Sequence, residues 1–82
     1  MTMLRTNNDF DEIRIVDGIA ERTGNTVGRN DVRRRQGVCR TMSELARKLR
    51  ANGDGYFYLA ASVWPEDKTS VDLTTEWKTF GS

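Results

Sequence analysis

TMSELARKLRANGDGYFYLAASVW, residues 41–64, is the stretch that decides the fold. Its second half, 55–64, is a run of apolar and aromatic residues that ends at Pro65 and predicts a strand. Its first half predicts a helix at about residues 42–52, because apolar residues recur there at helical spacing. These apolar residues are Met42, Leu45, Ala46 and Leu49. We expect this stripe, Leu49 included, to be buried against a sheet.

Both ends of this helix are marked in the sequence. Thr41 and Glu44 have the spacing of a capping box, in which the Thr41 hydroxyl accepts from the N–H of Glu44 and the carboxylate reaches back to the N–H of Thr41. Gly53 suits the left-handed conformation that ends many helices. These signals predict a helix that begins after Thr41 and ends before Gly53.

The chain after Pro65 predicts a partner for the strand. Residues 65–70 are polar except for the proline. Over 71–79 one alternating set consists of Val71, Leu73, Thr75, Trp77 and Thr79, and the other of Asp72, Thr74, Glu76 and Lys78. A period of two indicates a half-buried strand. The loop length favours an antiparallel hairpin of 55–64 with 71–79.

Two interpretations compete for residues 10–22. Asp17-Gly18 separates two β-branched runs, which favours a hairpin with a type I′ turn. The rival is a helix over 10–22, but it would place Gly18 in its interior. We prefer the hairpin. A two-residue loop would give these cross-strand pairs: Val16 with Ile19, and Arg14 with Glu21.

The remaining segments carry weaker signals. Residues 1–9 are polar and are expected to be frayed. Residues 23–26 have turn chemistry. Residues 30–37 fit either two turns of helix or an exposed basic segment.

Two architectures follow. The preferred one is a small single α+β domain over residues 1–82 with ββαββ order, in which two hairpins form one antiparallel sheet against the helix. The alternative is a winged helix, with helices at about 10–22, 30–36 and 42–52 followed by a hairpin wing. In that fold the last helix would enter the DNA major groove. Strands as apolar on both faces as 55–64 are unusual in a wing.

The sequence offers little for catalysis. It has no histidine, which removes the commonest general base, the Ser-His and Cys-His pairs and every His-containing zinc site. Cys39, the single cysteine, is expected to be a half-buried structural residue. Asp9, Asp11 and Glu12 are expected to be solvated acids and not a metal site. We therefore expect no enzymatic activity, no metal and no cofactor.

Charge is concentrated in the middle of the chain. The net charge is +1, but residues 29–50 hold eight basic and two acidic residues between acidic flanks. Such a block is expected where a protein contacts a polyanion, although it also fits a solvated face paired with the acidic flanks. The basic residues are Arg29, Arg33, Arg34, Arg35, Arg40, Arg47, Lys48 and Arg50.

Aromatic residues give a second candidate surface. Tyr56, Tyr58 and Trp64 are separated by even numbers of residues, which places them on one face of the expected strand. Trp77 lies on the expected neighbouring strand. Aromatic side chains beside basic ones can stack the bases of single-stranded nucleic acid. They can also form a hot spot for a protein partner, or simply pack a core.

Together these features predict a small non-catalytic binding protein, an inhibitor or adaptor of the kind that phage and other mobile elements encode. It would dock on a larger protein or nucleoprotein target, or on nucleic acid, through the basic block and the aromatic residues. The alternative is a winged-helix DNA-binding regulator. Neither a membrane span of ~20 apolar residues nor the apolar part of a signal peptide is found, so we expect a cytoplasmic protein without a membrane partner. A dimer is compatible with these features.

Overall fold

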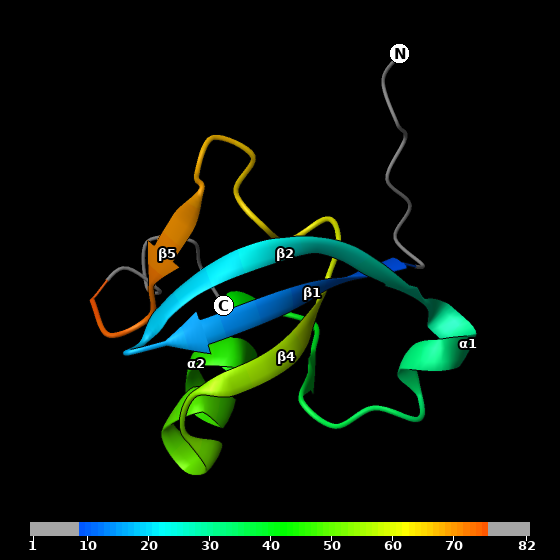
Figure 1. Cartoon of the computed structure of the whole chain (residues 1–82), viewed down its shortest axis with the longest axis horizontal. Helices are drawn as coiled ribbons and strands as arrows, with labels where there is room; N and C mark the ends of the chain where they lie inside the picture. The colour runs from blue at the N-terminus through cyan, green and yellow to red at the C-terminus, as the bar shows by residue number, and fades with distance from the viewer. Residues whose placement is uncertain (1–8, 76–82) are drawn as a thin grey trace.

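The computed structural model describes residues 9–75 and arranges them as a five-stranded sheet with one main helix (Figure 1). The sheet order is β3-β4-β1-β2-β5, with β3 parallel to β4 and the other neighbours antiparallel. The predicted α+β class is confirmed, with a mixed sheet in place of a purely antiparallel one. The elements are β1 (Asp9–Val16), β2 (Ile19–Gly28), α1 (Arg29–Val32), β3 (Val38–Cys39), α2 (Met42–Asn52), β4 (Gly55–Ala60) and β5 (Ser70–Asp72).

Helix α2 begins and ends where the sequence predicts. The Thr41 hydroxyl accepts from the backbone N–H of Glu44 at 3.0 Å, as expected for the cap. The Glu44 carboxylate accepts from the N–H of Arg40 at 2.7 Å, one residue before the donor that a capping box predicts. Gly53 has a φ of +81°, and its N–H donates to the carbonyl of Leu49 at 2.7 Å.

The predicted N-terminal hairpin is confirmed as β1 and β2. Asp17 and Gly18 have φ values of +54° and +79°, and a type I′ turn requires positive φ at both positions. The Asp54 carboxylate accepts from the N–H of Asp17 at 2.8 Å and from that of Gly18 at 3.3 Å, which ties the turn to the loop after α2. The rival helix over 10–22 is wrong. The winged-helix alternative is therefore also wrong, because it required this helix. The register contains both predicted pairs, Val16 with Ile19 and Arg14 with Glu21.

Strand β2 is longer than predicted because its middle forms a bulge and not a turn. Residues 23–25 stand opposite Glu12 alone, and Gly24 has a φ of +95°. The Glu12 carboxylate accepts from the Thr23 hydroxyl at 2.8 Å and from the Asn25 side-chain amide at 3.1 Å. A carboxylate on the neighbouring strand therefore stabilises the extra residues, and the strand continues to Gly28.

The predicted C-terminal hairpin is wrong, because β5 pairs with β2 and not with β4. Both edges of β4 are already occupied, by β1 on one side and by β3 on the other. Strand β4 ends at Ala60, four residues early, and residues 61–69 lead across to the outer edge of β2. Trp64 stabilises this crossover, since its indole N–H donates to the carbonyl of Lys68 at 2.9 Å.

Some predicted segments lie outside residues 9–75, and others differ in their bounds from the prediction. Residues 76–79 of the expected last strand, including Trp77, lie outside the described residues, as do residues 1–8, which were expected to be frayed. Asp9 belongs to β1. In the ambiguous segment, α1 is a single helical turn, after which the N–H of Arg35 donates to the carbonyl of Val32 at 3.0 Å.

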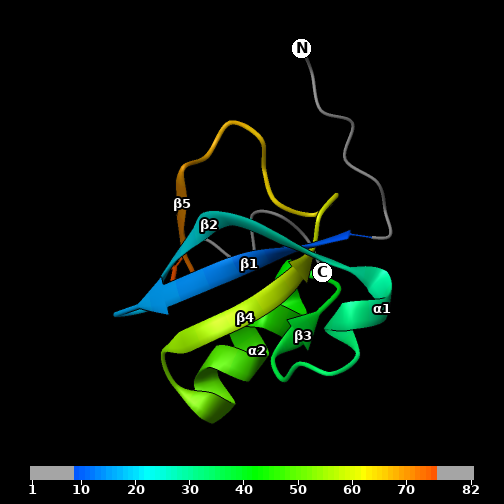
Figure 2. The same cartoon turned by 45° about the vertical axis from the view of Figure 1, so that its right-hand side comes forward.

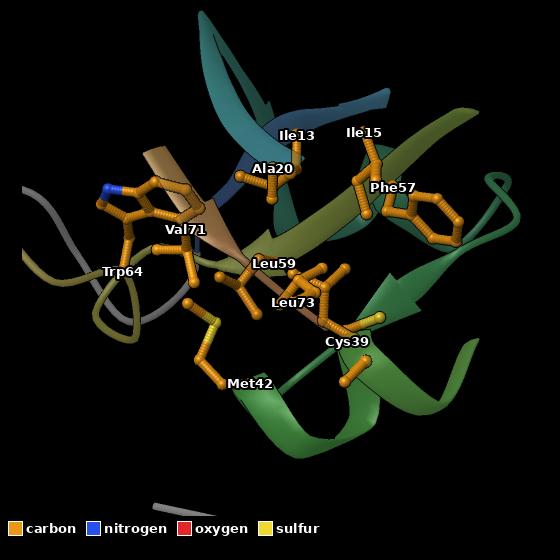
Figure 3. Packing of buried hydrophobic residues seen from close by; sticks show 12 residues of the cluster. Ile13, Ile15, Ala20, Cys39, Met42, Phe57, Leu59, Trp64, Val71 and Leu73 are labelled. Carbon is orange, nitrogen blue, oxygen red and sulfur yellow. The ribbon is translucent and has the colours of Figure 1, made fainter. Parts of the chain in front are cut away.

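The two faces of the sheet are covered unequally. We call the face toward α2 the first face and the opposite face the second face. Figure 2 shows α2 against β4 and β3, and Figure 3 shows Met42 of α2 pointing toward Leu59, with Trp64 beside Val71. The main core between α2 and the first face contains Ile13, Ile15, Ala20, Cys39, Met42, Leu45, Ala46, Phe57, Leu59, Trp64, Val71 and Leu73. Leu49, which was expected to be buried with the rest of the stripe, packs against this core but is only partly buried.

Helix α1 covers one end of the second face. Val32 is its buried residue and packs with Phe10, Val27 and Tyr58 in a separate small cluster. These residues belong to the second face because Phe10 pairs with Val27 and alternates with the core residues of β1. The other end of the second face is open around Val16 and Tyr56, which are 45% and 57% exposed.

Candidate binding surface

The structure separates the three aromatic residues that the sequence places on one face. Trp64 follows β4 and lies in the main core with 2% of its surface exposed, so its predicted position beside the tyrosines is wrong. Tyr58 lies on the second face but is 7% exposed, because α1 and its neighbours cover it. Of the three, Tyr56 alone presents an open ring.

The sheet also divides the predicted basic block into two groups. Three of its members, Arg47, Lys48 and Arg50, are on α2, beside the first face. The other five lie in α1, in the turn after it and just past β3: Arg29, Arg33, Arg34, Arg35 and Arg40. All five are exposed, and α1 packs on the second face. The basic block is therefore not one continuous surface, and its larger part lies with Tyr56 and Tyr58.

Two arginines of this larger group lie over aromatic rings of the second face. The guanidinium carbon of Arg35 is 5.5 Å from the centroid of the Tyr58 ring, and that of Arg40 is 5.6 Å from the centroid of the Phe10 ring. A cation near a ring face at this distance is stabilised by the ring quadrupole. The rings therefore restrict where these two charges can lie.

A third arginine lies on the same face beside Tyr56. Arg14 of β1 is directly opposite Tyr56 of β4, and directly opposite residues point to the same side of a sheet. Sequence reasoning paired Arg14 with Glu21 across the hairpin, which is correct, but did not include it in the binding surface. The pairing of β1 with β4 joins residues at least 40 positions apart, so no local signal could have revealed this neighbour.

The three arginines form a row along β1, and we call Arg14, Arg35 and Arg40 the arginine row. Arg40 lies at Phe10, Arg35 lies at Tyr58 opposite Glu12, and Arg14 follows two residues later. Each two-residue step along a strand is about 6.8 Å. The row thus has one arginine at each step: Arg40 and Arg35 lie over aromatic rings, and Arg14 is directly opposite Tyr56.

Glu12 lies within the arginine row, but its carboxylate is already hydrogen-bonded. Besides the bonds from Thr23 and Asn25, it accepts from the Tyr58 hydroxyl at 3.5 Å, and Arg35 donates to that hydroxyl at 3.5 Å. The bond from Thr23, followed by that from Asn25, lowers the pKa of Glu12 below its usual value. Glu12 thus stays ionised and stabilises the bulge and the ring under Arg35.

The charge of this surface is positive despite Glu12. The second face, α1 and the following turn carry the arginine row together with Arg29, Arg33 and Arg34. The acids among them are Glu12, Glu21, Asp31 and Asp72. Six arginines against four acids leave a net charge of +2. The hairpin tip beyond Arg14 is acidic, since Asp17 and Asp54 lie there. The positive potential is therefore highest at the α1 end and falls toward the tip.

Other reactive side chains lie away from this surface. Asp11 is 2% exposed, so the expectation of a solvated acid is wrong for it: it occupies a first-face position in the central strand β1. Cys39 is fully buried, and burial raises the pKa of its thiol to about 11, so it is protonated at neutral pH. Within residues 9–75, no group of three or more Cys, Asp or Glu side chains is placed to hold a metal ion. No helix in this same range is long and apolar enough to cross a membrane.

Known proteins give no guide to this surface. Comparisons with protein-family models, with curated proteins and with solved structures find no match for the chain. The surface is therefore interpreted from its own geometry and charge.

Proposed function

We propose that this chain is a non-catalytic binding protein, an inhibitor or adaptor, that docks on a larger protein or nucleoprotein target. The observation that supports this most is the arginine row with its aromatic neighbours, bordered by the exposed Arg33 and Arg34. Arginine and tyrosine are enriched at binding hot spots. The planar guanidinium group also binds carboxylates and phosphates through two parallel hydrogen bonds.

The available side-chain chemistry fits binding better than catalysis. The chain has no histidine, and its single thiol is buried and protonated. The second face instead offers two cations, Arg35 and Arg40, whose positions are restricted by rings, which lowers the entropy lost when a partner orders them. Such a surface suits recognition of an acidic target.

A pull-down from the native host, with and without nuclease, tests the proposal. The variant Arg33→Ala/Arg34→Ala removes two exposed charges beside the arginine row. Its matched control, Arg47→Ala/Arg50→Ala, removes the same charge from α2 on the other side of the sheet. We expect the first variant to bind the captured target about tenfold more weakly, a loss of about 1.4 kcal/mol, and the control to bind like the unmodified chain.

The same variants define the kind of contact. If the target is a protein, the loss should concentrate in one arginine, and lysine at that position should restore little, because lysine cannot form the bidentate contact. Both variants should melt at nearly the same temperature as the unmodified chain, since exposed charges contribute about 0–1 kcal/mol to stability. Equal affinity of both variants for the captured target would contradict a docking role for this surface.

A further inference from the structure

We infer that the arginine row and Tyr56 together bind single-stranded nucleic acid, with phosphates on the arginines and a base stacked on the tyrosine ring. This inference rests on the proposed function and names the chemistry of its partner. Proteins that bind single strands combine a positively charged track for the backbone with aromatic side chains on which bases stack. The second face contains both, in neighbouring positions of β1 and β4.

The arginine row is arranged as such a backbone track. The three register positions at which its arginines lie, Phe10, Glu12 with Tyr58, and Arg14, follow one another in two-residue steps of about 6.8 Å, which is comparable to the separation of successive phosphates in an extended single strand. Arg35 and Arg40 lie over the rings of Tyr58 and Phe10, so these two side chains lose less conformational entropy when a phosphate binds. A guanidinium group can also stack on a base, which adds to phosphate binding.

Tyr56 provides the base platform. It is 57% exposed and lies directly opposite Arg14, at the end of the row that α1 leaves open. Val16 lies two residues beyond Arg14 on the same face and is 45% exposed, which adds an apolar contact for the stacked base. Base stacking on an aromatic side chain tolerates every base, so the binding should depend little on sequence.

The acidic hairpin tip limits the site on one side. Asp17, Glu21 and Asp54 lie beyond or beside Arg14 and would repel further phosphates. The strand should therefore follow the row from the α1 end, where Arg33 and Arg34 attract it, and end at Tyr56. Three steps of the row correspond to about three nucleotides, fewer than an OB-fold site, so binding should be weak and strongly salt-dependent.

The surface favours a single strand over the other macromolecular partners. Sequence readout in the major groove of a duplex uses a helix or a two-stranded ribbon. The helix on this face, α1, has four residues, and the β1–β2 hairpin is flanked by β4 and β5 within the sheet. A stable protein interface needs about 800 Å² from each partner around an apolar centre. Among residues 9–75, the large apolar side chains that are exposed are Val16 and Tyr56, so this face offers a protein partner its arginines more than an apolar centre.

The test is fluorescence anisotropy of the full chain with a labelled oligothymidylate of about ten nucleotides, a labelled duplex of the same length, and polyglutamate as an anionic competitor. We expect the single strand to bind more tightly than the duplex, and polyglutamate to compete poorly. Three phosphate contacts predict a slope of about −2 for the logarithm of affinity against the logarithm of salt concentration.

Two substitutions separate stacking from charge. Tyr56→Ala should weaken binding about tenfold without changing the salt slope, whereas Tyr56→Phe should keep the affinity because the ring remains. Arg14→Gln should reduce the slope by about 0.7. Arg47→Ala on α2 is the matched charge control and should leave both quantities unchanged. Since Tyr56 and Arg14 are exposed, unchanged melting temperatures will show that the variants fold.

The outcomes separate this inference from the proposed function. No binding to the single strand, or binding that neither Tyr56→Ala nor Arg14→Gln alters, overturns the inference. If the host pull-down still captures a target after nuclease treatment and Arg33→Ala/Arg34→Ala weakens that complex, the docking function stands with a protein partner. Loss of the captured target upon nuclease treatment, together with a salt slope near −2, supports both the single-strand inference and the docking function on a nucleoprotein target.

Discussion

The first and second faces of the sheet differ in what covers them. Helix α2, with eleven residues and hydrogen-bonded ends, covers the first face and encloses a core of twelve buried residues. Helix α1, with four residues, covers one end of the second face over a cluster of four. Because burial contributes about 25 cal/mol for each Å² of apolar surface, most of the stability must come from the first face. The second face is thereby free to expose arginines and Tyr56.

The largest expected effect compares one buried side chain from each face. Leu45 of α2 is 0% exposed, and Leu45→Ala should lower the free energy of unfolding by about 2–5 kcal/mol through lost burial and a cavity. Val32 of α1 is 4% exposed, and Val32→Ala should cost about 1–2 kcal/mol, because only two methyl groups are removed from a smaller cluster. Urea unfolding of both variants measures the difference. Leu49→Ala should lower the free energy of unfolding by less than Leu45→Ala does, since Leu49 is only partly buried.

An equal cost for Leu45→Ala and Val32→Ala would break the comparison, because it would mean that α1 contributes as much to the core as α2 does.

A smaller effect compares the beginnings of the two helices. Thr41 caps α2 through its hydroxyl, and Thr41→Ala should cost about 0.5–2 kcal/mol. Gly28 precedes α1 and makes no side-chain cap, although its φ of −69° and ψ of 158° suit serine and a Cβ there would meet open space. Gly28→Ser should therefore stabilise the chain by about 0.5 kcal/mol, from the new cap and from a less flexible unfolded chain.

Melting curves of Thr41→Ala and Gly28→Ser at one pH and salt concentration test these opposite signs. A Gly28→Ser variant that melts earlier than the unmodified chain would show that α1 is limited by something other than its missing cap.

The smallest effect is the pH dependence that Glu12 gives the second face. Its hydrogen bonds from Thr23 and Asn25 lower its folded pKa below the usual 4.5, so the ionised form stabilises the folded chain. This contribution is fully present above pH 4.5 and is lost as the pH falls through the lower folded pKa. Unfolding of the unmodified chain and of Glu12→Gln should therefore differ at pH 7 and converge at the acidic end. A difference that grows on acidification would contradict the role assigned to Glu12.

The sequence predicted the elements whose signals are local. Residues 41–53 carry their own cap, stripe and terminal glycine, and α2 forms over Met42–Asn52. Asp17-Gly18 carries the turn chemistry of the first hairpin, and the register follows from a two-residue loop. The bulge at 23–25 was mistaken for a turn because the same residue types favour both, and only the Glu12 carboxylate on the next strand distinguishes them.

The candidate surface was less predictable than the helix. Exposure of the charges at 33–35 follows from three consecutive arginines, since no regular element can bury all three. The separation of Tyr56 from Trp64 and the addition of Arg14 both depend on β4, which ends at Ala60 and lies beside β1. Periodicity in the sequence cannot specify where a strand stops or which edge it joins.

The amino-acid sequence by itself determined the helix, the first hairpin and the excess of positive charge, because each depends on residues within a few positions of one another. The tertiary structure alone decided that β1 is central, that β5 joins β2, and that the sheet divides the basic block. Strand edges are chosen by competition between distant segments, and here β1 and β3 occupied both edges of β4 and left the edge of β2 for β5. The pairing of β4 with β1 placed Arg14, Arg35 and Arg40 in one row beside the open ring of Tyr56.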